Sequence, residues 1–64
     1  MSDNIMNLTE KILIIKHANL ADATILDSNY YTLISNTPNA EEKEQFLILR
    51  NNAQLRIKEL TLAE

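Results

Sequence analysis

The sequence contains no cysteine, no glycine and no tryptophan, and it has one proline among its 64 residues. The lack of cysteine excludes disulfide bonds, thiolate nucleophiles and zinc sites built on thiolates. The lack of glycine excludes a glycine-rich phosphate loop. His17 is the single histidine, so one chain cannot build a catalytic triad or a closed metal site around it. We therefore expect a protein that is not an enzyme, with no catalytic residue, no cofactor and no metal.

Basic charge and long apolar runs are also scarce. Six Lys and Arg residues face nine Asp and Glu residues, which gives a net charge of −3. This charge repels phosphate backbones, so nucleic acid is not the expected partner. No apolar run is longer than four residues, and residues 1–7 lack a basic segment followed by a long apolar stretch. These patterns predict no membrane span and no secretory signal, and hence a cytoplasmic protein.

What the chain does contain favours helix. Ile and Leu together supply 18 residues and Val supplies none, while most other positions hold Ala, Glu, Lys, Gln, Arg or Asn. We expect a single all-α domain over residues 1–64. A connection is predicted at residues 36–38, where Thr37 can cap a helix whose first residue is Pro38 and which runs to about residue 63. The alternative cap is Asn39, with Glu42 three residues later.

Upstream of this turn, apolar residues recur at steps of three and four, which is the spacing of one helical face. The stripe consists of Ile5, Leu8, Ile12, Ile15, Asn19, Ala23, Leu26, Tyr30 and Leu33. It predicts a first helix from about residue 4 to 35 and thus a hairpin of two long antiparallel helices. A three-helix bundle with a break near Asn19 or residues 27–29 is the alternative. The lack of glycine argues against such a break, because tight reversals usually need a residue tolerant of positive φ.

Both predicted helices are apolar on two sides, and a hairpin can cover only one of them. The hairpin core is expected to contain Phe46, Leu49, Ala53 and Ile57 of the second helix, with Ile12 and Ile15 of the first. The second apolar side would stay exposed in a monomer. We therefore expect a homodimer, most simply a four-helix bundle. The predicted oligomer or partner interface comprises Ile14, Ala21, Ile25, Ile48, Leu55 and Leu62.

Antiparallel pairing around residue 38 would bring Leu60 beside Ile15. It would also bring Arg56 beside Asn19 and Asp22. These last three residues form a predicted polar layer, since a buried Asn in an apolar stripe can set the register of a bundle.

These patterns favour a small non-catalytic interaction protein, such as an adaptor, a chaperone-like escort or an inhibitor of a larger protein. Its expected partners are a second copy and another protein. The alternative function is a nucleic-acid-binding regulator, because one sector of the second helix carries Lys43, Arg50 and Lys58 as possible phosphate contacts.

Overall fold

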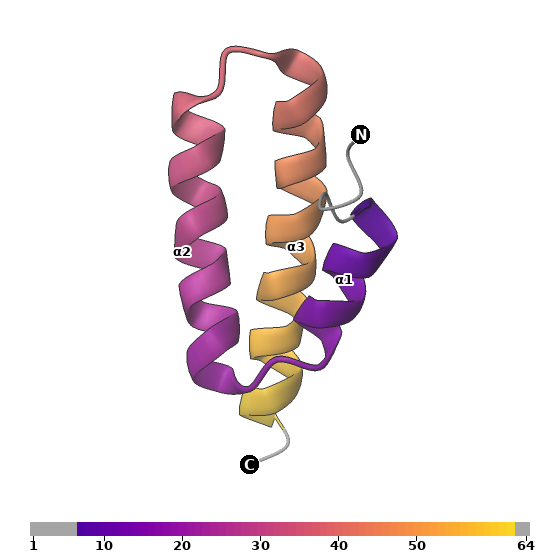
Figure 1. Cartoon of the computed structure of the whole chain (residues 1–64). Coiled ribbons are helices and arrows are strands. Elements are labelled where there is room, and N and C mark those ends of the chain that lie inside the picture. The colour runs from indigo at the N-terminus through magenta and orange to yellow at the C-terminus, as the bar shows by residue number, and fades with distance from the viewer. Residues whose placement is uncertain (1–6, 63–64) are drawn as a thin grey trace.

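The structure is a computed structural model that describes residues 7–62. It contains three helices, α1 (Leu8–Lys16), α2 (Leu20–Asn36) and α3 (Ala40–Leu62), and no strand within that range. The prediction of an all-α chain is thereby confirmed. α1 and α3 run in the same direction and α2 runs in the opposite one, with α3 between the other two in the view of Figure 1. Both α1 and α2 pack on α3, whereas they make few contacts with each other.

The prediction of one helix from about residue 4 to 35 is wrong, because the helix is interrupted between Lys16 and Leu20. The alternative had placed a break near Asn19, which is where it lies. The connection needs no glycine: His17 has φ −105° and Asn19 has φ −79°. No residue in the described range adopts positive φ. Asn19 is extended, and any residue can adopt that conformation, so the argument from missing glycine fails.

Helix length explains why folding back is favourable. A straight helix over residues 4–35 would be about 48 Å long, whereas the 23 residues of α3 span about 35 Å. A hairpin of these two helices would leave part of the longer one without a partner. Breaking at residues 17–19 returns α1 along α3, so that the apolar stripes of α1 and α2 both face it. Of the predicted stripe, Ile15 and Ala23 are buried and Leu8, Ile12, Leu26 and Tyr30 pack against the core, whereas Asn19 and Leu33 are exposed. Ile5 lies outside the described residues.

Each helix begins with the same capping hydrogen bond. The side-chain Oδ1 of Asn7, Asn19 and Asn39 accepts a hydrogen bond from the backbone N–H three residues later, at 2.8, 2.8 and 3.0 Å. These donors belong to Glu10, Asp22 and Glu42, whose negative charges also suit the positive end of a helix dipole. The prediction that Thr37 caps the last helix is wrong, and the alternative cap at Asn39 is confirmed.

The core lies where α1 and α2 meet α3. Ile15 and Leu49 are 1% exposed and Ala53 is fully buried, and Leu8, Ile12, Leu26, Tyr30 and Phe46 pack against this cluster. The prediction that Ile15 lies beside Leu60 is wrong. α1 runs parallel to α3 instead of antiparallel, so Ile15 lies one turn before the contact between Ala18 and Arg56 and packs with Leu49 and Ala53.

Candidate helix-docking groove

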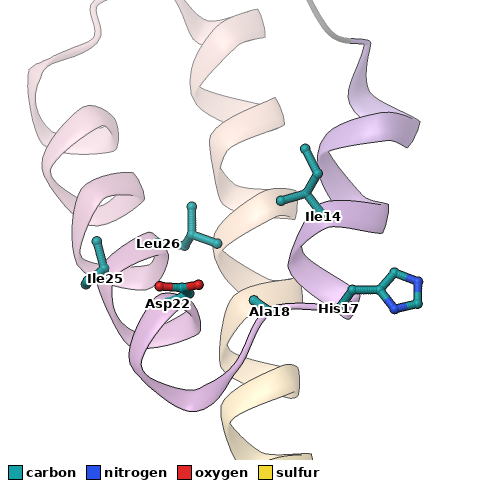
Figure 2. A pocket seen from close by; sticks show the side chains of 6 residues that line it. All are labelled: Ile14, His17, Ala18, Asp22, Ile25 and Leu26. Atoms are coloured by element: carbon teal, nitrogen blue, oxygen red, sulfur yellow. The ribbon is translucent and has the colours of Figure 1, made fainter.

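An apolar groove runs between α1 and α2. It consists of two adjoining hollows of about 430 and 140 Å³, and Ile14 and Leu26 line both. His17, Ala18, Asp22 and Ile25 complete the larger hollow, and Lys11, Ile15 and Tyr30 complete the smaller one. Figure 2 shows the larger hollow, with Ile14 projecting from α1 and Leu26 from α2 while α3 lies behind them.

The rims of the groove are apolar side chains that the chain itself leaves exposed. Ile14 on α1 is 49% exposed and Ile25 on α2 is 57% exposed. The floor is more deeply buried, since Ile15 and Ala18 lie in the core. Exposed aliphatic side chains above a buried apolar floor are typical of surfaces that bind another protein.

The two ends of the groove carry opposite charges. Lys11 lines the smaller hollow, and Asp22 lines the larger one. Neither side chain belongs to an ion pair with any other residue between 7 and 62. His17 also borders the larger hollow, but its imidazole points away from the other five lining residues (Figure 2). The interior is thus apolar, with a cation at one end and a carboxylate at the other.

Tyr30 joins the groove to the interior of the α2–α3 pair. Its ring stacks on Phe46 with the ring centroids 6.1 Å apart and the planes at 28°. Burial raises the pKa of the Tyr30 phenol above its ordinary value of 10.0, because the phenolate loses hydration there.

The predicted interface residues fall on separate surfaces. Ile14 and Ile25 lie together on the groove, whereas Ala21 is exposed on α2 outside its lining. The other three, Ile48, Leu55 and Leu62, are exposed on one face of α3, and none of them lines the groove.

The predicted polar layer does not form as a buried layer. Asn19 is exposed and caps α2, and Asp22 is exposed on the first turn of that helix. Arg56 Nε donates a 2.8 Å hydrogen bond to the carbonyl oxygen of Ala18. The guanidinium Nη1 of Arg56 also lies 3.8 Å from Glu59 Oε1. Arg56 therefore holds the α1–α2 connection against α3. The sequence pattern placed Arg56 beside Asn19 but did not indicate that its partner is the backbone of Ala18.

The predicted basic sector is only partly free. Arg50 Nε lies 3.0 Å from Asp27 Oδ1 and its guanidinium carbon lies 4.8 Å from the centre of the Tyr31 ring. Lys43 and Lys58 are exposed. Arg50 is thus engaged in joining α2 to α3, because its charge is balanced by Asp27 and its plane rests on an aromatic ring.

Sequence reasoning missed the groove itself. Lys11, Leu26 and Tyr30 meet Ile14 there only because α1 folds back beside α2, which a continuous helix would prevent. The signal that could have revealed this is the repeated pattern of Asn followed three residues later by an acid, at Asn7, Asn19 and Asn39. Each occurrence marks a helix start, and the second marks the break.

Comparison with known proteins found no matching family model, no matching curated protein and no matching solved structure. Across the described part of the chain, no helix has both the length and the apolar character needed to cross a membrane. Residues 7–62 also contain no cluster of three metal-ligating His, Asp or Glu side chains.

Proposed function

We propose that this chain is a small non-catalytic interaction protein whose α1–α2 groove receives a helix of another polypeptide. The observation that supports the proposal is a continuous apolar groove between two helices, with Ile14 and Ile25 exposed at its rims. Helix-in-groove recognition uses this kind of surface, since an amphipathic helix places its apolar face in the groove. A helix docked there would complete a four-helix arrangement.

Docking on the groove would bury apolar surface that the chain leaves exposed. Full burial of one Ile or Leu contributes about 1.5 to 3 kcal/mol, so the two half-exposed side chains of the groove, Ile14 and Ile25, supply roughly 2 kcal/mol on one side of the contact. The incoming apolar face contributes a similar amount. These gains act against the lost freedom of the two bodies, so the expected affinity is modest.

The nucleic-acid alternative has weaker support. It depended on Lys43, Arg50 and Lys58 acting together, and Arg50 is paired with Asp27 and stacked on Tyr31. Two exposed lysines on a chain of net charge −3 make a small phosphate-binding surface.

A pair of adjacent residues on α1 tests the proposal. Ile14 and Leu13 are 49% and 50% exposed, but only Ile14 lines the groove. Ile14→Asp should abolish the association of the chain with its protein partner in extracts of its native cells, because the carboxylate would be buried on docking. Leu13→Asp should retain the association and serves as the matched control. Circular dichroism should show both variants helical.

Equal loss of association in both variants would show a general effect of the added charge, and full retention in both would contradict the proposed role of the groove.

A further inference from the structure

The charges of the groove have an arrangement that fits a two-fold axis. Lys11 lies at one end and Asp22 at the other, and Ile14 and Leu26 lie between them. A two-fold contact brings the same surface of both copies together in reversed orientation. The cationic end of one groove would then meet the acidic end of the other, while the apolar centres meet each other.

The surface beside the groove has the shape that such a contact requires. Ile14 of α1 is 49% exposed and lines both hollows, so it forms an apolar ridge along one edge of the groove. In an isologous contact, ridge and groove must belong to the same patch, because each copy supplies both. An unrelated helix would not require this opposite placement of charge.

We propose that the occupant of the groove is a second copy of this chain, docked about a two-fold axis near Ile14 so that Lys11 of each copy faces Asp22 of the other. This inference rests on the proposed function and deepens it by naming the partner. This axis places the α1 helices of the two copies antiparallel to each other. Each dimer then contains two Lys11–Asp22 pairs. The contact uses Ile14 and Ile25 of the predicted interface and leaves Leu55 outside it.

Charge reversal tests the register. Lys11→Glu alone places two acidic side chains opposite each other at both ends of the dimer contact, and Asp22→Lys alone places two cations opposite each other at both ends. Each variant should therefore raise the dimer dissociation constant about tenfold or more. When the two variants are mixed, they can form a heterodimer. In this heterodimer both pairs between positions 11 and 22 consist of opposite charges. Sedimentation equilibrium should therefore show the mixture dimerising almost as tightly as the unchanged chain, and so should a chain that carries both reversals.

Leu55→Asp is the control for the other apolar surface. Leu55 is exposed on α3 outside the groove, so this variant should dimerise like the unchanged chain. Circular dichroism on each variant separates dissociation from unfolding. If a reversal unfolds the chain, Lys11→Gln and Asp22→Asn replace it, each with a smaller expected loss of dimer.

Three results would overturn the inference: an unchanged chain that sediments at the 7.3 kDa mass of one copy at millimolar concentration, reversals without effect, or a mixture no tighter than its components. A photo-crosslinking residue at Ile25 then separates the two proposals in native cells. A crosslink to a second copy supports both, and a crosslink to a different protein overturns this inference alone. The absence of any crosslink contradicts the proposed function. Tyr31, also on α2 and equally exposed at 57%, is the matched control position.

Discussion

Three asparagine side chains set where the helices begin. Asn7, Asn19 and Asn39 each accept a hydrogen bond from a backbone N–H that has no partner within its own helix. Asn19 has the largest structural consequence, because its cap starts α2 immediately after the chain leaves α1. A residue expected to lie buried in a polar layer thus acts through the backbone at an exposed position.

Replacing this cap should weaken the fold measurably. Asn19→Ala removes the acceptor for the Asp22 N–H and should lower the free energy of unfolding by about 1 kcal/mol. Urea unfolding followed by circular dichroism measures the change. Asn51 is exposed within α3, so Asn51→Ala should leave stability unchanged or raise it slightly. An Asn19→Ala variant as stable as the Asn51 control would argue against the cap.

The burial of Tyr30 predicts a loss of stability in alkali. The pKa of Tyr30 is raised in the folded chain, so its phenol stays protonated while the phenol of the unfolded chain loses its proton near pH 10. The stabilisation is complete below pH 10 and is lost as the pH rises through the higher folded pKa, because the unfolded state binds fewer protons there.

The measurement is urea unfolding between pH 8 and pH 11. Tyr30→Phe keeps the ring contact with Phe46 but has no proton to lose, so its stability should fall less over this range. Tyr31→Phe changes an exposed ring and should follow the unchanged chain. Identical alkaline profiles for Tyr30→Phe and the unchanged chain would contradict the assignment.

At the scale of the elements, periodicity predicted most of the buried positions, with Asn19 and Leu33 as exceptions, but it did not predict where the helix breaks. The apolar steps run from Ile15 through Asn19 to Ala23 without a gap, although the helix breaks at residues 17–19. Both helices face α3, so each keeps its own apolar stripe and the two stripes happen to stay in phase. Spacing alone cannot distinguish this case from one long helix.

A distance measurement tests the break directly. Spin labels at Glu10 and Ser35, which are both exposed, would be about 38 Å apart in one continuous helix. Because α1 runs antiparallel to α2, the structure predicts a clearly shorter separation. Labels at Glu41 and Lys58, which both lie in the uninterrupted α3, should give about 26 Å and provide the internal standard.

At the scale of the whole molecule, the chain has more apolar surface than its three helices cover. Ten large apolar side chains remain exposed among the described residues, and Ile14 and Ile25 on the groove are two of them. A chain of this size buries about 60% of the surface that its unfolded form exposes, a smaller share than a larger domain buries. Association would therefore add stability that the monomer lacks.

The melting temperature should therefore depend on concentration. If a dimer forms through the groove, a hundredfold increase in protein concentration should raise the melting temperature by about 5 °C or more, because mass action favours the associated folded state. Lys11→Glu should show a much smaller rise. Thermal unfolding followed by circular dichroism at several concentrations provides the measurement. Equal melting temperatures at every concentration for the unchanged chain would mean that folding and association are not linked.

The sequence by itself determined the helical class, the side of each helix that is buried and the apolar surplus. Each of these depends on residue type and local spacing, as the burial of Ile15, Leu49 and Ala53 illustrates. The last helix start was also readable from Asn39 and Glu42.

Only the tertiary structure decided that α1 folds back along α3. The groove forms as a result of this packing. That choice depends on how much surface two helices of unequal length can cover against each other, which no local pattern contains. The meeting of Lys11 with Tyr30, and of Arg56 with the carbonyl oxygen of Ala18, follows from the same choice. Residues far apart along the chain come together there because packing on α3, and not helical spacing, places them.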